Sequence, residues 1–506
     1  MVYKHHHAWF LVPSWGHMTS GNTTIVRMLQ LNPDLVITVV RHAIVAAKGD
    51  AHLALFPDFA RDRVRFVDAG DPDLLSKGFG LGMLQQSMKD LSAAWLETLS
   101  SSTKPDSSWP APTALVLDQA GTLDTLPQAR EIVGPECKVL LHLTISASCA
   151  YGLFASTAES GVSDLEEIAD EIMKDEAKRN GRERQTVIEQ VACVKNGTDS
   201  FNGTIIRVPG VKPMYDYERE MGNCPSPPGI GVILSQMVTL GKKVDGIISA
   251  SSTCLEGETI KALEKYTKVY PVGIQVAPRG WGKDGLEIKD ETLSNFLGKW
   301  GTNEVVFISF GSVFYPTTTP QYVQFLLQAL QELSIPFLFV LGGITAASQL
   351  SESFVTEINQ SGKGLIHTSW VDQQAILQHK SVGWFLTHGG WNSTVESLAQ
   401  GVPLIGWPMS QSDQPINVAL CATRDKPVSF EFMQIRQGAA KAPALRGGAP
   451  VVGDDESVKK EFREVFTKAF GEEGKVIRQN VEELARQLRE ERDGKADEVI
   501  KEFALL

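Results

Sequence analysis

A glycine-containing turn after one of the predicted strands holds the residues best suited to bind an anion. Residues 382–387 form a short apolar run, and His388-Gly389-Gly390-Trp391-Asn392-Ser393 follows it directly. We expect a helix from Thr394 to about Gln400, with Gly401 at its C-terminal end. A turn that leads into a helix N-terminus presents backbone N–H groups and the positive end of the helix dipole, which together bind phosphate. Ordinary βα turns share this pattern, so the turn alone does not identify a phosphate site.

Residues of a different kind end the predicted strands in the first half of the chain. His17 follows the apolar run 7–13, and Asp118 ends the run that begins at Thr113. In an open α/β sheet, functional side chains gather beyond the carboxyl ends of the strands. We therefore expect His17 and Asp118 at the same sheet edge. Asp124 lies just before a helical pattern and is typical of a helix N-cap.

These residues need a scaffold of strands and helices, and the sequence predicts two such scaffolds. Short apolar runs alternate with longer helical patterns, which indicates parallel sheets covered by helices on both faces. The Gly-rich, charged stretch 276–302 suits an interdomain linker, so we predict domains at 1–275 and 303–506, the second ending in polar helices. The predicted strands are 7–13, 35–40, 63–67, 113–118, 138–143, 304–310, 336–341, 364–367, 382–387 and 403–407.

The expected architecture is α/β, with two Rossmann-like domains facing each other across a cleft. We predict the first helix from about Gly21 to Leu31. The stretch 164–184 is a charged helical pattern interrupted at Gly181, typical either of a solvated helix or of a lid over a pocket. The stretch 439–455 is rich in Gly, Ala and Pro, which predicts a loop.

Composition narrows the classes of partner. The chain of 506 residues is 42% hydrophobic and 21% charged, which is typical of a globular protein. With 48 basic and 60 acidic residues its net charge is −12, which disfavours nucleic acid as a partner. The six cysteines form no CxxC pair, so neither a zinc module nor a disulfide framework is expected. We find no targeting segment and no membrane span, and we expect a cytoplasmic location.

The segment 370–414 closely resembles the donor-binding signature box of the nucleoside-diphosphate-sugar glycosyltransferases, best known from plant secondary-metabolite glucosyltransferases. The resemblance covers the segment nearly from end to end. The matching residues are Trp370, Gln373, His379, Gly383, Phe385, His388, Gly390, Trp391, Asn392, Ser393, Glu396, Gly401-Val402-Pro403, Pro408, Asp413 and Gln414.

The resemblance implies a role in binding a UDP-sugar for each part of this box. Trp370 would stack on uracil, and Gln373 would help to hold the base. Glu396 would bind the ribose hydroxyls, and Asp413 and Gln414 the sugar hydroxyls. The diphosphate would be contacted by His388, Asn392, Ser393 and, after the first strand of the second domain, Ser312.

The sequence departs from the family pattern at three places in the box. Asp372 stands where the family usually has Pro, and Gly389 where it often has Cys. The approach Ser410-Gln411-Ser412 is one residue longer than usual. Glu396 also has a structural interpretation, because Ser393-Thr-Val-Glu396 fits a capping box with Ser393 as the N-cap.

The resemblance further implies a catalytic base in the pair Gly16-His17. A Pro that commonly follows such a pair is missing, and Met18-Thr-Ser-Gly21 stands there instead. Histidine is an effective base at neutral pH when a carboxylate holds its other ring nitrogen and stabilises the imidazolium. We predict that Asp118 is this carboxylate and that Asp124 is structural.

The predicted protein is an inverting glycosyltransferase of the GT-B fold, which moves a sugar from a UDP-sugar to the hydroxyl of a small lipophilic or phenolic acceptor. The family pattern associates Gln414 with glucose, so UDP-glucose is the expected co-substrate. We expect no cofactor and no metal. The pattern Asp71-Pro72-Asp73 could hold a divalent cation, but its context favours a turn. Two alternatives are a nucleotide-sugar epimerase and a UDP-sugar-binding protein without catalytic activity.

Overall fold

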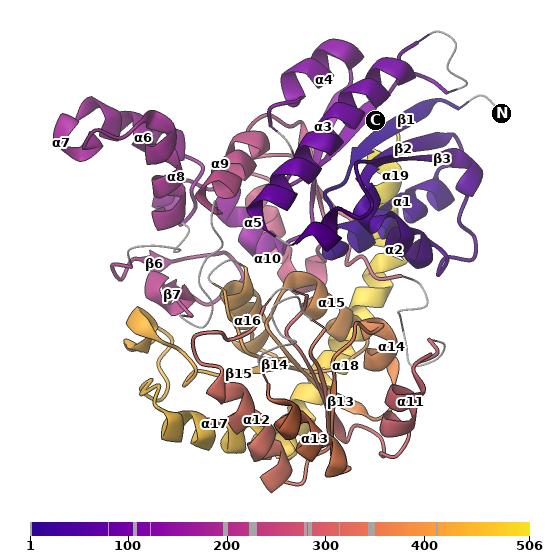
Figure 1. Ribbon diagram of the computed structural model, residues 1–506. Coiled ribbons are helices and arrows are strands. Elements are labelled where there is room, and N and C mark those ends of the chain that lie inside the picture. The colour runs from indigo at the N-terminus through magenta and orange to yellow at the C-terminus, as the bar shows by residue number, and fades with distance from the viewer. Residues whose placement is uncertain are drawn as a thin grey trace. The chain divides into compact units, whose positions relative to one another are not determined.

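The structure is a computed structural model with two compact units. It describes residues 3–78, 80–104, 109–121, 123–195, 201–221, 230–277, 281, 286–312, 314–342, 350–410 and 413–506. Unit 1 comprises Met1–Lys195, Pro227–Pro278 and Glu490–Leu506, and unit 2 comprises Asn196–Ser226 and Arg279–Arg489. Each unit is built around a parallel sheet (Figure 1).

In the described part of unit 1, strands of one sheet lie in the order β3-β2-β1-β4-β5-β8-β9, and all neighbours are parallel. The chain adds β2 and β3 on one side of β1 and then β4 and later strands on the other side. This reversal places a topological switch point at the carboxyl ends of β1 and β4. The strands are β1 (His5–Phe10), β2 (Leu35–His42), β3 (Val64–Ala69), β4 (Ala114–Asp118), β5 (Lys138–Leu143), β8 (Gly246–Ser249) and β9 (Val269–Pro271).

Helices pack on both faces of this sheet because side chains alternate between the faces along each strand. Trp9 of β1 packs in a core with residues of α1, whereas the next residue, Phe10, packs edge-on against Trp95 of α3. The helices are α1 (Trp15–Leu31), α2 (Ala43–Leu53), α3 (Leu81–Ser102), α4 (Leu126–Val133), α5 (Ala147–Phe154), α6 (Leu165–Lys174), α7 (Glu176–Arg179), α8 (Arg184–Lys195), α9 (Ile230–Gly241), α10 (Thr253–Leu263) and α19 (Lys495–Phe503).

The first helix is longer than the prediction that began at Gly21. Helix α1 begins at Trp15, because Ser14 is its extended N-cap residue and its carbonyl accepts from the N–H of Met18 at 2.9 Å. Gly21 lies inside the helix, where an added Cβ would come within 2.9 Å of Leu11 Cδ2. The glycine therefore permits close packing of α1 on the end of β1 and does not mark a helix start. His17 consequently lies in the first turn of α1.

The C-terminal residues complete the core of unit 1, although the sequence division placed all of 303–506 in the second domain. Ile500 and Phe503 of α19 belong to the same apolar cluster as Trp9. Arg27 of α1 donates to Asp497 Oδ1 at 2.7 Å, which ties α19 to α1. Helix α19 belongs to unit 1 because its apolar face is buried in the core of that unit.

The predicted helical stretch 164–184 forms α6, α7 and the start of α8. Figure 1 shows α6 and α7 standing away from the helices that cover the sheet of unit 1. Arg184 donates to Asp170 Oδ1 at 2.7 Å, so α6 and α8 are joined by an ion pair on their exposed sides. Gly181 follows Asn180, and both have positive φ, which ends α7.

In the described part of unit 2, the parallel sheet has the order β12-β11-β10-β13-β14-β15. The reversal here lies between β10 and β13. The strands are β10 (Val305–Ser309), β11 (Phe337–Val340), β12 (Gly364–His367), β13 (Val382–Thr387), β14 (Leu404–Gly406) and β15 (Ser429–Glu431). The antiparallel pair β6 (Ile205–Ile206) and β7 (Met214–Tyr215) also belongs to this unit.

The core of unit 2 is rich in aromatic side chains. Trp407, after β14, packs against Phe310, Phe432 and Phe462. The helices are α11 (Glu291–Leu297), α12 (Gln321–Glu332), α13 (Glu352–Gln360), α14 (Gln373–Gln378), α15 (Trp391–Ala399), α16 (Gln414–Ala422), α17 (Asp455–Ala469) and α18 (Glu472–Arg492). Between the short 3-10 turn Gly438–Lys441 and α17 the chain has no regular element, as the loop prediction for 439–455 expects.

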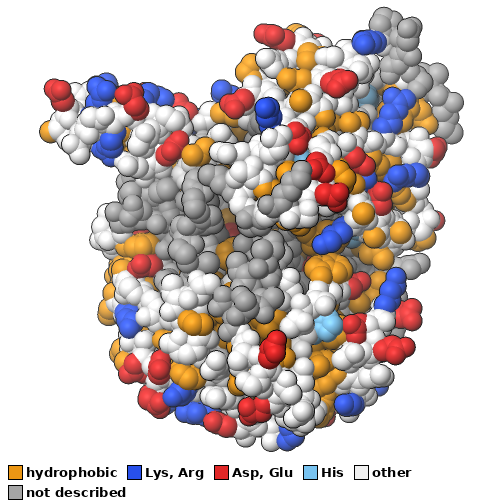
Figure 2. Space-filling model, in the orientation of Figure 1, with side chains coloured by type: hydrophobic (Ala, Val, Ile, Leu, Met, Phe, Trp, Pro, Cys, Tyr) orange, Lys and Arg blue, Asp and Glu red, His pale blue; other side chains and the backbone are white. Residues whose placement is uncertain are grey.

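Two observations concern a membrane span and the charge of the surface. Among the described residues, no helix combines the length and the apolarity needed to cross a bilayer. On the face drawn in Figure 2, acidic and basic side chains are interspersed.

Candidate functional site

The first candidate site lies at the switch point of unit 1 and pairs a histidine with an aspartate. His17 is held in the first turn of α1, just after β1, and Asp118 is the last residue of β4. The Nδ1 atom of His17 lies 2.9 Å from Asp118 Oδ1 and 2.8 Å from Asp118 Oδ2. The structure thus brings the two predicted residues into direct contact.

The environment of this pair suits a base and its orienting carboxylate. A carboxylate only accepts hydrogen bonds, so His17 carries its proton on Nδ1 and offers Nε2 as the basic nitrogen. The side chain of His17 is 20% exposed, whereas that of Asp118 is fully buried. The backbone N–H of Ala120 also donates to Asp118 Oδ1, at 2.9 Å, which fixes the carboxylate.

Asp124 does not take the place that the sequence suggested. It is exposed, and the N-cap residue of α4 is Thr125. The prediction of an Asp124 N-cap is therefore wrong, because α4 begins one residue later than that role requires. Asp124 comes six residues after Asp118, the last residue of β4, and therefore does not lie at the strand end.

The Asp71-Pro72-Asp73 segment forms a turn. Asp71 Oδ1 accepts from the N–H of Asp73 at 2.9 Å, and the carbonyl of Asp71 accepts from Leu74 at 3.2 Å. This is the Asx-turn geometry that an Asp-Pro-Asp sequence favours. The turn leads into a short 3-10 helix, Leu74–Lys77.

The second candidate site lies at the switch point of unit 2. Ser309 ends β10 and is paired in register with Thr387, which ends β13. The segments that follow, Phe310-Gly311-Ser312 and the turn from His388, therefore leave the sheet side by side. Ser312 is exposed, so its hydroxyl group is accessible to a ligand.

His388 lies between two glycines that leave room for it. Gly311 has φ +73°, and an added Cβ there would come within 2.9 Å of His388 Cε1. A Cβ at Gly390 would come within 2.5 Å of His388 Nε2. The ring of Phe314 stacks on the imidazole, with centroids 5.3 Å apart. Burial lowers the pKa of His388 to about 4, so it is neutral at pH 7 and can donate one hydrogen bond to a phosphate without adding charge.

Helix α15 begins earlier than predicted. Its first residue is Trp391, not Thr394, and its N-cap is Gly390 in an extended conformation. Glycine has no side chain with which to cap, and the N-terminal end of α15 lies beside His388, which is the arrangement that binds anions at helix N-termini. Asn392 and Ser393 lie in this first turn.

The early start of α15 removes the capping-box interpretation of Glu396. Ser393 is inside the helix and is not its N-cap. The carboxylate of Glu396 instead accepts from Gln373 Nε2 at 2.7 Å and from Gln374 Nε2 at 3.3 Å. Gln373 Nε2 also lies 3.3 Å from Ser393 Oγ, so three of the predicted donor residues form one cluster. Burial raises the pKa of Glu396 to about 7, so about half of this carboxyl group is ionised at neutral pH.

The residue that departs from the family pattern before this cluster has a structural role. Asp372 Oδ1 accepts from the N–H of Ala375 at 3.1 Å, so Asp372 is the N-cap of α14. It therefore sets the position of Gln373 at the start of that helix. Trp370, two residues earlier, follows β12, and the residue is 54% exposed. An exposed indole is suited to stack on a planar base.

The two residues predicted to bind the sugar are engaged with the protein itself. Gln414 is 1% exposed, and its Oε1 accepts from the N–H groups of Met409 at 2.8 Å and Ser410 at 3.0 Å. Asp413 Oδ2 accepts from Asn417 Nδ2 at 2.9 Å. The intervening Gln411 and Ser412 lie outside the described residues. Contact of Asp413 and Gln414 with a sugar stays a prediction.

Sequence reasoning missed Asn417. Its side chain donates both to Asp413 and to the carbonyl of Gly389, at 2.9 Å each, and so links the start of α16 to the turn after β13. The only signal in the sequence was the spacing of four residues between Asp413 and Asn417, which places both side chains on one face when the segment is helical, as α16 is.

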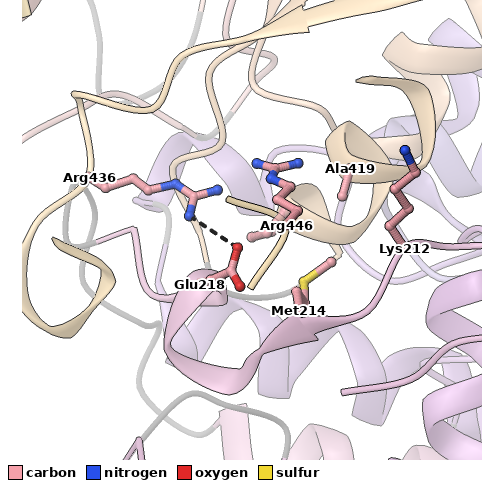
Figure 3. Close-up of a pocket in the computed structure, with 7 residues that line it drawn as sticks. Lys212, Met214, Glu218, Ala419, Arg436 and Arg446 are labelled. Atoms are coloured by element: carbon pink, nitrogen blue, oxygen red, sulfur yellow. Dashed lines mark ion pairs between the residues drawn. The ribbon is translucent and has the colours of Figure 1, made fainter. Parts of the chain in front are cut away.

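A small pocket in unit 2 includes none of the predicted donor residues in its lining, although its Pro415 directly follows Gln414 (Figure 3). Its buried Arg436 pairs with Glu218 at 3.9 Å and with Glu431 at 2.7 Å, and Arg446 pairs with Glu431 at 2.6 Å. We interpret this network as structural, since it joins Glu218 to β15, which ends at Glu431, and to the loop that holds Arg446. The lining residues are Lys212, Met214, Glu218, Pro415, Ala419, Arg436 and Arg446.

Comparisons with known proteins agree with the resemblance seen in the sequence. Residues 287–444 match the family model described as UDP-glucoronosyl and UDP-glucosyl transferase. UDP-glycosyltransferase eriJ of Hericium erinaceus is 30% identical over 322 residues, which are 60% of this chain and 62% of that protein. The 7-deoxyloganetin glucosyltransferase of Catharanthus roseus is 31% identical over 195 residues, 36% of this chain and 39% of that protein. The chain thus spans less than two thirds of each of these relatives.

Solved structures share the fold over the whole chain. The TcCGT1 protein in complex with UDP has a TM-score of 0.70 at 22% identity, covering 99% of this chain and 98% of that one. Phytolacca americana UGT2, complexed with UDP-2fluoro-glucose and pterostilbene, has a TM-score of 0.67 at 22% identity, covering 99% of both chains. The expected GT-B fold, with a parallel α/β sheet in each domain, is therefore confirmed.

Proposed function

We propose that this protein transfers a sugar from a UDP-sugar to the hydroxyl group of a small lipophilic acceptor, because residues 287–444 match the family model described as UDP-glucoronosyl and UDP-glucosyl transferase. The observation that carries the proposal is the contact between His17 and Asp118 at the switch point of unit 1, at 2.8 Å. A UDP-sugar site alone would also serve a binding protein. A histidine with an orienting carboxylate in the other unit adds the base that transfer to a hydroxyl needs.

In the proposed mechanism, His17 Nε2 accepts the proton of the acceptor hydroxyl as the oxygen attacks the anomeric carbon. Asp118 holds Nδ1 and stabilises the imidazolium that forms. The oxygen forms its bond to the anomeric carbon while the bond from that carbon to UDP breaks. One such displacement from the face opposite UDP inverts the anomeric configuration. The proton ends on His17 and leaves to solvent.

Unit 2 would bind the donor and stabilise the departing UDP. Negative charge develops on the diphosphate as UDP departs. Hydrogen bonds from the start of α15 and from His388, Asn392, Ser393 and Ser312 would stabilise it. Glu396 would accept hydrogen bonds from the ribose hydroxyls, and Gln373 would hold the base beside the exposed ring of Trp370. The geometry that supports these roles is the cluster of Glu396, Gln373 and Ser393 next to the turn after β13.

We propose glucose as the transferred sugar and a phenol or another lipophilic alcohol as the acceptor. The family pattern that ends in Gln414 supports glucose. We propose also that the protein works without a metal, because helix N–H groups and the polar side chains of the turn can stabilise the diphosphate charge.

A product screen tests this function. The protein is incubated with UDP-glucose, UDP-galactose and UDP-glucuronate, each with phenolic, sterol and terpenoid acceptors, with and without EDTA, and the mixtures are read by mass spectrometry. We expect a glucoside in the first series, unchanged by EDTA. A UDP-sugar isomer formed without acceptor would identify an epimerase. UDP binding without any product would identify a non-catalytic binding protein.

A further inference from the structure

A buried histidine lies beside the proposed catalytic pair, and the mechanism above does not use it. His142, near the carboxyl end of β5, is paired with Asp118 in the register of β4 and β5. The N–H of Gln119, the next residue after Asp118, donates to the carbonyl of His142 at 3.2 Å. Both the Asp118 and His142 side chains are fully buried. His142 is therefore the cross-strand neighbour of the carboxylate that holds His17.

The side chain of His142 contacts the same helix as Asp118 does. Its Nε2 lies 3.3 Å from Ser20 Oγ, and Ser20 is buried on α1. His17 and Ser20 are three residues apart and so lie on one face of α1. The helix is thus attached to the sheet twice, by His17 to β4 and by Ser20 to β5. These two contacts join the first turns of α1 to adjacent strands, in addition to the apolar packing of the helix in the core.

We propose that His142 is a positioning residue for the pair of His17 and Asp118, an inference that rests on the proposed function. Through Ser20 it fixes the first turns of α1, and thereby the direction in which His17 presents Nε2. A general base acts only within hydrogen-bond reach of the proton it removes. Small displacements of such a group lower turnover strongly.

The charge state of His142 suits this role. Burial lowers its pKa to about 4, so the ring is neutral at physiological pH. A cationic ring at this position would also attract the Asp118 carboxylate. It would therefore weaken the stabilisation that Asp118 gives to the His17 imidazolium. Trp9 packs edge-on against the ring with centroids 5.4 Å apart, which holds it in place.

Three single variants, one double variant and one matched control test the proposal. His142→Phe and Ser20→Ala each remove one partner of the contact, whereas His142→Gln keeps a polar nitrogen close to the place of Nε2. We expect kcat to fall about ten-fold or more in the first two variants, with the Kd for UDP unchanged, and to recover in His142→Gln. The double variant should be no slower than the slower single variant. His7→Phe is the control, because His7 is an equally buried histidine on β1 whose pKa burial lowers to about 3.

A second readout needs no activity. ¹⁵N NMR of the His17 ring in the protein without substrates reports its tautomer and its titration. We expect a single tautomer with the proton on Nδ1 in the natural protein, and a mixed tautomer with a moved midpoint in His142→Phe and Ser20→Ala. A merely structural role would lower the melting temperature and leave the His17 titration unmoved. Natural His17 spectra and natural kcat in both variants would overturn the proposal. If the natural protein glycosylates no acceptor, the proposed function fails, yet the spectra still decide whether His142 positions His17.

Discussion

Replacing Asp118 by asparagine tests how His17 is activated. The change preserves the shape of the side chain and removes its charge. It takes a full negative charge from 2.8 Å of the His17 ring, in a place where the aspartate side chain is fully buried. An amide can also donate to Nδ1, which would leave the proton on Nε2 and block that nitrogen as a base.

The size of the effect follows from the charge that is lost. Two unit charges about 4 Å apart attract by ~4 kcal/mol at an effective dielectric constant of about 20. Since about 1.4 kcal/mol corresponds to ten-fold in rate, the largest electrostatic loss is roughly 10³. Loss of general-base assistance costs about 10²–10⁴. We expect kcat for Asp118→Asn to fall by about 10²–10³.

The assay is steady-state glucoside formation, with UDP affinity measured by calorimetry. UDP affinity should stay within about two-fold, because the donor residues belong to the other unit. Asp124→Asn is the matched control, since this aspartate is exposed and lies six residues further along the chain. A kcat for Asp118→Asn within three-fold of the natural value would refute the role of the carboxylate.

Three further predictions concern residues that the sequence assigned to the donor. Glu396→Gln should raise the donor KM about ten-fold, because a charge-assisted bond of roughly 1.5–3 kcal/mol is weakened. The pKa of Glu396 is about 7 and its ionised form accepts from ribose, so UDP should bind up to about ten-fold more tightly at pH 8 than at pH 6. Calorimetry that shows the same pH dependence in Glu396→Gln would contradict this. Gln414→His removes the acceptor for the N–H groups of Met409 and Ser410, so we expect a loss of about 1–3 kcal/mol in the free energy of unfolding. A change of preference to UDP-galactose at unchanged stability would show instead that this side chain faces the sugar.

The sequence predicted the long, apolar strands of both sheets well, because a buried parallel strand leaves an unbroken apolar run. It missed β8, β9 and β15, which have three or four residues each. Charged residues lie within or directly beside each of them (Asp245, Lys268 and Glu431), so no unbroken apolar run marks these strands. The helix starts at Trp15 and Trp391 were also missed, because glycines near each start were interpreted as the turn itself.

The sequence predicted which site residues lie close together when these residues stand at the ends of neighbouring strands. His17 and Asp118 follow neighbouring strands of a doubly wound sheet, and so do Ser312 and His388. The hydrogen-bond partners of the side chains could not be predicted from the sequence, because they depend on tertiary packing, which the spacing of residues does not encode. Examples are the contact of Glu396 with Gln373, the N-cap role of Asp372 and the burial of Gln414.

The measurement that tests the central claim most directly is the product formed by the natural protein and by His17→Ala from UDP-glucose and a phenolic acceptor. ¹H NMR of the purified product gives its anomeric configuration. We expect a β-glucoside from the α-linked donor with the natural protein, and no product with His17→Ala even though it still binds UDP. An α-linked product, or natural turnover by His17→Ala, would contradict an inverting transfer in which His17 removes the acceptor proton.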